Sequence, residues 1–125
     1  MNNCFIILAA GQSKRFKSKK PKQYVFFKNK YLYQHSLDKV LKSGLFKHIL
    51  LVVNNKNLIT AKYPRSVKII KGGKERSDSS YLALKYVNKL NTNNVLIHDA
   101  ARPNFSIRLI KNLLKSLKKN KAVIP

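Results

Sequence analysis

Short apolar runs alternate with helical patterns along almost the whole chain. The apolar runs, which are continuous as expected for strands covered on both faces, are residues 3–9, 48–54, 67–71 and 95–98. The helical patterns, which repeat their apolar residues at the helix period, are residues 34–43, 75–90 and 107–119. This order predicts an α/β fold with a mostly parallel, Rossmann-like sheet and helices on both of its faces.

Local signals refine these elements. Gly44 follows the first helical pattern as a natural C′ residue, and Ser106 precedes the last one as an N-cap. Residues 24–33 predict a small hairpin or turn, and the apolar residues 122–124 begin a further strand. The residues expected to face the core from the second helix are Ala83, Leu84, Val87 and Leu90.

The length and composition fit one folded domain. A chain of 125 residues, 44% of them hydrophobic, can bury a core of its own. It contains no run of eighteen apolar residues, so we expect no membrane span. The start of the sequence leads directly into a strand without a charged leader, which predicts a mature cytoplasmic protein. The single cysteine, Cys4, excludes an internal disulfide and is expected to be a small buried strand residue.

The charge is strongly positive. The chain has 27 lysines and arginines against 4 acidic residues, a net charge of +23, which on its own suggests binding to nucleic acid or an anionic membrane. The lysines are scattered, however, and asparagine is abundant as well, a pattern typical of drift in an A/T-rich coding sequence. We interpret the charge as a solvated surface with incidental polyanion binding. A basic nucleic-acid-binding module is the alternative.

The stretch from Leu8 to Gln23 carries the first chemical signal. The small residues Ala9, Ala10 and Gly11 follow the first strand, where backbone N–H groups can come close to an anion. The loop after them holds one arginine and five lysines, with no acid. It lacks both the P-loop ending and the dinucleotide fingerprint. The combination indicates a nucleotide triphosphate site.

Residues 72–80 join the third strand to a helix. Gly72 and Gly73 permit a tight turn, and the helix start offers free N–H groups and a partial positive charge. Glu75 and Asp78 suit that first turn electrostatically, so simple helix capping is one interpretation. Ligand binding at the same turn is the other.

Asp99 directly follows the fourth predicted strand, residues 95–98. A phosphoryl-transfer enzyme needs a hard oxygen ligand for Mg²⁺ opposite its triphosphate loop, and Asp99 is placed to supply one. A structural ion pair with Arg102 is the alternative. His98 is expected to have a supporting or structural role, without proton transfer, and His35 and His48 to be structural or exposed.

Taken together, the three segments resemble one enzyme family. Their order and spacing are similar to the L-A-A-G-x-G-x-R…P-K-Q, G-G-x-x-R-x-x-S-V and H-D-A-A-R-P motifs of the 2-C-methyl-D-erythritol 4-phosphate cytidylyltransferases. Ser13 replaces the second glycine of the first motif, and Ser80 replaces the valine of the second. The resemblance extends to the end of the chain and implies a nucleotide-diphospho-sugar transferase fold.

The family resemblance implies a reaction and a set of roles. CTP and 2-C-methyl-D-erythritol 4-phosphate would give 4-diphosphocytidyl-2-C-methylerythritol and pyrophosphate, a step of the non-mevalonate isoprenoid pathway. Arg15 and Lys22 would be catalytic, stabilising the charge on the phosphates, and Asp99 would bind the Mg²⁺ cofactor. The residues that would bind the nucleotide are Ala9, Ala10, Gly11, Gly72, Gly73, Arg76, Ser79, Asp99 and Arg102.

The resemblance also implies that part of the enzyme is missing from this sequence. Family members are much longer, and their C-terminal half carries the acceptor site, another basic catalytic residue and a dimerising arm. Residues 1–125 are therefore expected to be the CTP-binding part of a single cytidylyltransferase domain, with a homodimer as the full-length form. A ribitol-5-phosphate cytidylyltransferase and a nucleotide-binding domain without turnover remain alternatives.

Overall fold

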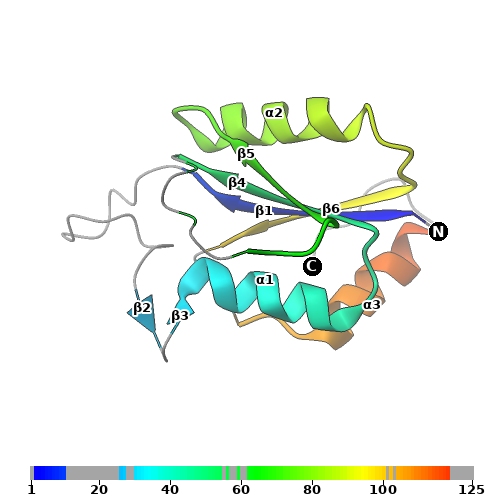
Figure 1. The fold of residues 1–125 in the computed structure, drawn as a ribbon. Helices are drawn as coiled ribbons and strands as arrows, with labels where there is room; N and C mark the ends of the chain where they lie inside the picture. Colours follow the sequence, from blue (N-terminus) through cyan, green and yellow to red (C-terminus); the bar gives the residue numbers. More distant parts are fainter. Residues whose placement is uncertain are drawn as a thin grey trace.

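A parallel sheet forms the centre of the molecule (Figure 1). The computed structural model describes residues 2–10, 26–27, 30–54, 56, 59, 62–100, 102 and 104–118. Within them the sheet has the strand order β5-β4-β1-β6. Its strands are β1 (Asn3–Ala9), β4 (His48–Val53), β5 (Val67–Lys71) and β6 (Asn94–Asp99). Each neighbouring pair is parallel, as the continuous apolar runs predict.

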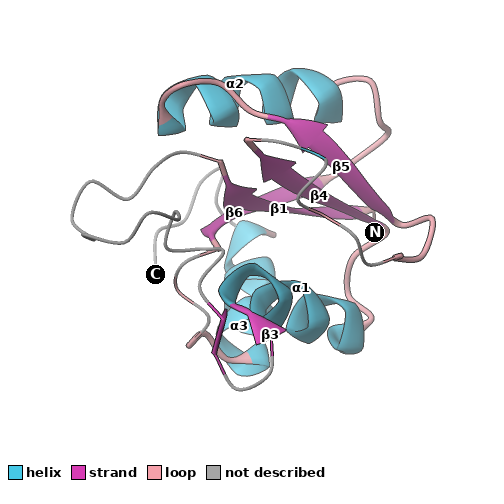
Figure 2. Cartoon of the chain, turned by 60° about the vertical axis from the view of Figure 1, so that its left-hand side comes forward, coloured by secondary structure: helices cyan, strands magenta, loops and turns pink. Residues whose placement is uncertain are grey.

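Helices cover both faces of this sheet. The helices are α1 (Leu32–Ser43), α2 (Arg76–Val87) and α3 (Ile107–Leu117). Figure 2 shows α2 on one face, with α1 and α3 together on the other. The predicted α/β, Rossmann-like architecture is thereby confirmed. No helix in the described ranges has the length and apolar character that crossing a membrane requires.

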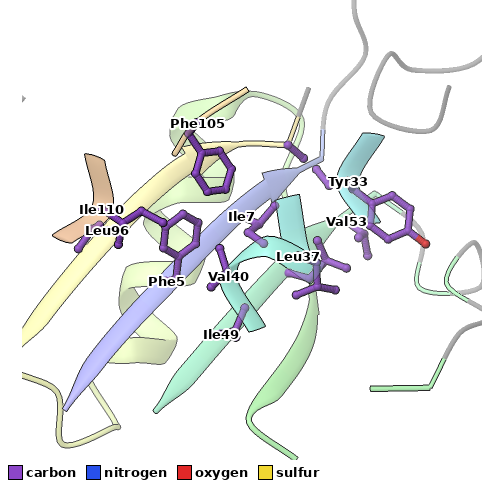
Figure 3. Close-up of a cluster of buried hydrophobic side chains, with 13 residues drawn as sticks. Phe5, Ile7, Tyr33, Leu37, Val40, Ile49, Val53, Leu96, Phe105 and Ile110 are labelled. Atoms are coloured by element: carbon purple, nitrogen blue, oxygen red, sulfur yellow. The ribbon is translucent and has the colours of Figure 1, made fainter. Parts of the chain in front are cut away.

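Strand β1 contributes side chains to two separate cores. Phe5, Ile7 and Ala9 pack towards α1 and α3, in a cluster that includes Leu37 and Ile110 (Figure 3). Cys4, Ile6 and Leu8 point to the opposite face and pack with Ala83 and Val87 of α2. All six residues of β1 from Cys4 to Ala9 are buried, so the strand is apolar throughout and not alternating.

The helix ends follow the local signals. Gly44 ends α1 with φ +66°, in the left-handed region that favours glycine, as its C′ position predicts. Ser106 caps α3, because its hydroxyl accepts a hydrogen bond from the Leu109 N–H at 3.0 Å. Helix α1 begins two residues earlier than its periodicity indicates, since the Gln34 Oε1 accepts from the Tyr31 N–H at 2.9 Å.

The prediction for the inner face of α2 is partly wrong. Ala83 and Val87 are buried, whereas Leu84 is 44% exposed. One helical step of about 100° separates Leu84 from Ala83 and turns its side chain away from the sheet. The helix also ends at Val87, and Leu90 lies beyond it in a turn, where its N–H donates to the Val87 carbonyl.

Two further predicted elements lie at the margins of the sheet. Residues 24–33 were expected to form a hairpin, and β2 (Phe26–Phe27) and β3 (Lys30–Tyr31) pair antiparallel there. The strand expected at residues 122–124 lies outside the described residues. Strand β6 extends one residue past its predicted end, to Asp99, because Asp99 still pairs in register with Leu8 of β1.

Candidate functional site

Those predicted site residues that the structure describes lie at or near the carboxyl ends of β1, β5 and β6, which are on the left-hand side of Figure 1. Strand β1 ends at Ala9, β5 at Lys71 and β6 at Asp99. The chain leaves β1 to build β4 and β5 on one side and returns to build β6 on the other. The boundary between β1 and β6 is therefore the topological switch point, where ligands bind in open α/β sheets.

Gly72 joins the first two predicted motifs by close packing. A Cβ added to Gly72 would lie 2.5 Å from the Ser79 Oγ, 2.6 Å from the Ala10 Cβ and 2.9 Å from a Val52 methyl. Its N–H also donates to the Val53 carbonyl at 2.8 Å. Among the described glycines only Gly44 has a positive φ, so the backbone conformation of Gly72 does not itself require glycine. Gly72 is required because any side chain would collide with these neighbours.

The turn after β5 is held by the start of α2. The Gly73 N–H donates to the Ser79 Oγ at 3.2 Å, and Ser79 is 1% exposed. The Glu75 N–H donates to the Asp78 Oδ2 at 3.1 Å, which satisfies a backbone donor at the helix start. The capping interpretation of Asp78 is thus confirmed. Nucleotide binding at the same turn stays a prediction.

Asp99 forms an ion pair that the sequence did not indicate. Its Oδ2 lies 3.3 Å from the Nη1 of Arg76, the first residue of α2. Arg102 contacts Asp99 through its backbone, since the Arg102 N–H donates to the Asp99 carbonyl at 3.1 Å. The side chains of Arg76 and Asp99 are 63% and 37% exposed, so both remain accessible to a ligand.

His98 belongs to the opposite face of the sheet. It pairs in register with Ile7, while Asp99 pairs with Leu8, so the two side chains point to different faces. The His98 ring meets the Phe105 ring edge-on at 4.5 Å, and its Nε2 contacts the Arg102 carbonyl at 2.5 Å. Burial lowers the pKa of His98, which favours the neutral ring. These contacts fit the predicted structural role, in which His98 supports the segment after β6.

Comparison with known proteins identifies the family. A family model described as 2-C-methyl-D-erythritol 4-phosphate cytidylyltransferase matches residues 3–125. The chain belongs to this family. The resemblance carried by the three motifs is therefore confirmed, and the matched range extends over nearly the entire sequence.

Curated relatives agree with this assignment. The chain is 51% identical to a bifunctional enzyme IspD/IspF of Pelagibacter ubique, over 100% of this chain and 34% of that protein. It is 38% identical to the 2-C-methyl-D-erythritol 4-phosphate cytidylyltransferase of Wigglesworthia glossinidia brevipalpis, over 88% of this chain and 49% of the relative. The chain thus spans about half the length of such relatives, or less.

Solved structures of the family share the fold. The bifunctional IspDF of Campylobacter jejuni matches with a TM-score of 0.81 at 28% identity, over 95% of this chain and 31% of its own. The Francisella tularensis 2-C-methyl-D-erythritol 4-phosphate cytidylyltransferase matches with a TM-score of 0.77 at 29% identity, over 96% of this chain and 54% of its own. Both confirm the predicted nucleotidyltransferase fold.

The described residues can be tested against the Mg²⁺ that the cytidylyltransferase motifs imply. Mg²⁺ is bound in such sites by one or two carboxylates, with substrate phosphates and water completing the shell. Asp99 offers one accessible carboxylate at the switch point and fits this mode. In the part of the chain that the structure describes, no group of three or more metal-binding side chains gathers. Phosphate oxygens and water would complete the shell around a metal held by Asp99.

The remaining predicted residues fall into two groups. Gly11, Arg15 and Lys22 lie outside the described residues, so the catalytic cations and the basic loop stay predictions. Ala9 and Ala10 are described at the end of β1, where Ala9 is fully buried and Ala10 half-buried. Ala10 lies against the Gly72 turn, so the first and second motifs meet.

Proposed function

We propose that residues 1–125 form the CTP-binding part of a cytidylyltransferase that makes 4-diphosphocytidyl-2-C-methylerythritol in the non-mevalonate pathway. The observation that carries the proposal is the meeting of the motifs at one edge of the sheet. Ala10, Gly72 and Ser79 pack together there, and Arg76 links their turn to Asp99. Family membership supports the same activity.

The reaction is a transfer of CMP. A phosphate oxygen of 2-C-methyl-D-erythritol 4-phosphate forms a bond to the α-phosphorus of CTP. The bond from that phosphorus to the oxygen of the β-phosphate breaks, and pyrophosphate leaves. The attacking phosphate is already ionised, so no protein nucleophile or strong base is needed. Catalysis then rests on positioning and on neutralising the developing negative charge.

The chain's own residues serve this chemistry as follows. Backbone N–H groups at Ala9, Ala10 and Gly11 approach the triphosphate, while Arg15 and Lys22 neutralise its charge. A Mg²⁺ cofactor would be held by Asp99 and would bind and polarise phosphate oxygens. The nucleotide-binding groups of the second and third motifs are Gly72, Gly73, Arg76, Ser79 and Arg102.

Nucleotide binding with Mg²⁺ tests the proposal. We expect CTP to bind more tightly than ATP to the 125-residue chain, measured by isothermal titration calorimetry. Asp99→Ala should weaken CTP binding about tenfold or more, because the carboxylate that holds the metal is lost. Asp38→Ala is the matched control, since Asp38 is also an ion-paired acid but lies on α1, beside Lys30. Equal, weak binding of both nucleotides that does not respond to Asp99→Ala would refute the proposal.

The acceptor is tested separately. A version of the protein that spans the whole length of its relatives should release pyrophosphate with 2-C-methyl-D-erythritol 4-phosphate and not with ribitol 5-phosphate. Turnover with ribitol 5-phosphate alone would assign the chain to the rival cytidylyltransferase activity.

The setting of the enzyme completes the proposal. We place it in the cytoplasm, with which its one cysteine, a buried free thiol, is compatible. We propose a homodimer for the full-length form, as the resemblance implies, and no specific nucleic-acid partner. Size-exclusion chromatography with light scattering on the full-length form measures the dimer directly.

A further inference from the structure

The ion pair between Arg76 and Asp99 ties two parts of the proposed CTP site together. Arg76 is the first residue of α2, and Asp99 is the last residue of β6. The pair joins these elements beside the carboxyl end of β1, because Asp99 lies in register with Leu8. The guanidinium therefore stands at the switch point, where a nucleotide triphosphate would bind.

The ion pair between Arg76 and Asp99 is weak enough to be broken by a ligand. Both side chains are well exposed, at 63% and 37%, and exposed pairs of this kind are weak because water screens them. The carboxylate of Asp99 is nevertheless the group that a hard cation needs. A divalent cation that arrives alone competes with the guanidinium for this carboxylate and weakens the anionic contact of Arg76, in a protein with a net charge of +23.

A triphosphate changes this balance. Its oxygens offer a planar guanidinium a new charge-assisted partner and bring ligands for the metal as well. Arg76 can then leave Asp99 without losing an anionic contact. With metal and nucleotide both bound, the Asp99 carboxylate contacts the metal and the Arg76 guanidinium contacts the triphosphate, so neither charge is left without a partner.

We propose that Arg76 is a positioning residue that pairs with Asp99 in the nucleotide-free protein and releases it more readily to a metal bound to a triphosphate than to a free metal ion. The inference rests on the proposed CTP site and adds an order of loading to it. The metal then enters preferentially together with the nucleotide. Arg76 thus disfavours the binding of a free divalent cation, by the modest factor that an exposed ion pair is worth.

Binding of Mn²⁺ without nucleotide, measured by electron paramagnetic resonance on the 125-residue chain, tests this directly. Arg76→Met should bind Mn²⁺ roughly two- to fivefold more tightly than the wild type, which is the worth of an exposed ion pair. Lys74→Met is the matched control, because it removes the same charge from an exposed side chain of the same turn. It should give less than half of that gain. The double variant Arg76→Met/Asp99→Asn should lose the gain.

A second arm adds CTP. Arg76→Met should bind CTP with Mn²⁺ less tightly than the wild type, so the two affinities move in opposite directions. A structural role alone would not produce this split. Unchanged or weaker Mn²⁺ binding in Arg76→Met, an equal gain in Lys74→Met, or no Mn²⁺ binding in any variant would overturn the inference. Failure of the proposed function is a different result, namely that wild-type protein does not prefer CTP over ATP.

Discussion

At the scale of single residues, Gly72 is the point where the motifs depend on one another. Its missing side chain lets Ala10 of the first motif and Ser79 of the second meet against Val52. The position has no strained backbone, so its requirement is purely one of space. A single methyl group here should disturb both walls of the proposed site.

Gly72→Ala is therefore expected to destabilise the protein by about 1–3 kcal/mol, the usual cost of overpacking a close contact. The added methyl would lie within 2.9 Å of three neighbours. The free energy of unfolding, measured by urea denaturation, gives the value. CTP affinity should fall as well, because the turn that follows β5 must shift.

Gly44 offers the contrasting control. It has φ +66° and nothing within 4 Å of an added Cβ, so its requirement is conformational. Asparagine tolerates this conformation, and Gly44→Asn should cost less than Gly44→Ala. At Gly72 asparagine should be worse than alanine. The same order of the two variants at both positions would contradict the distinction.

At the scale of elements, α1 and α2 bury leucines very differently. Leu37 of α1 is fully buried against the sheet, whereas Leu84 of α2 is 44% exposed. The hydrophobic pattern alone does not separate them, because α2 carries apolar residues around much of its circumference. Ala83 and Val87 are the α2 residues that face the sheet and are buried, and their short side chains let α2 pack closely against it.

The same substitution at both leucines measures this difference. Leu37→Ala should destabilise the protein by about 2–5 kcal/mol, because it leaves a cavity in the core. Leu84→Ala should change the free energy of unfolding by less than about 0.5 kcal/mol, as surface substitutions usually do. Denaturant unfolding of the two variants and the wild type provides the comparison. Similar losses at both positions would mean that α2 is covered by another part of the protein.

The buried thiol of Cys4 allows the packing of β1 to be tested chemically. Cys4 is fully buried, and burial raises the pKa of its thiol to about 11. The thiolate is the reactive form, so Ellman's reagent should react slowly with the native protein and faster as urea unfolds it. The chain has a single cysteine, so the colour change reports this site alone. Rapid, complete labelling of native protein would show that β1 is not packed as described.

Elements could be predicted from the sequence far better than their contacts. The four strands and three helices follow apolar runs and periodicity, and the capping roles of Gly44 and Ser106 follow from residue type. The Arg76–Asp99 pair could not be predicted, because it joins residues 23 apart through the packing of α2 beside β1. Motifs placed both residues at one edge of the sheet. Only the three-dimensional register brings their side chains together.

For the molecule as a whole, the net charge of +23 invites a second kind of binding. Lysines and arginines lie on exposed positions of several elements, as Lys68 of β5, Lys85 of α2 and Arg108 of α3 illustrate. A surface of this kind attracts any polyanion without reading its sequence. CTP at the edge of the sheet would instead be held by defined contacts. The two modes should therefore respond differently to salt and to substitution.

We expect heparin and single-stranded DNA to bind in a strongly salt-dependent way. Contact with about 6–10 phosphates would lower the affinity roughly 10³- to 10⁵-fold between about 50 and 200 mM salt, because condensed counterions are released. CTP carries few charges, so its affinity in the presence of Mg²⁺ should fall much less over the same range. Fluorescence anisotropy with labelled DNA and calorimetry with CTP measure the two slopes.

Asp99→Ala then separates the two modes within one protein. It should weaken CTP binding and leave the affinity for DNA unchanged or slightly higher, because one negative charge is removed from a basic surface. If DNA bound with sequence preference at high salt, and CTP competed for it, the basic surface would itself be a specific site. The charge would then be part of the function, and the cytidylyltransferase assignment would account for only some of what this chain binds.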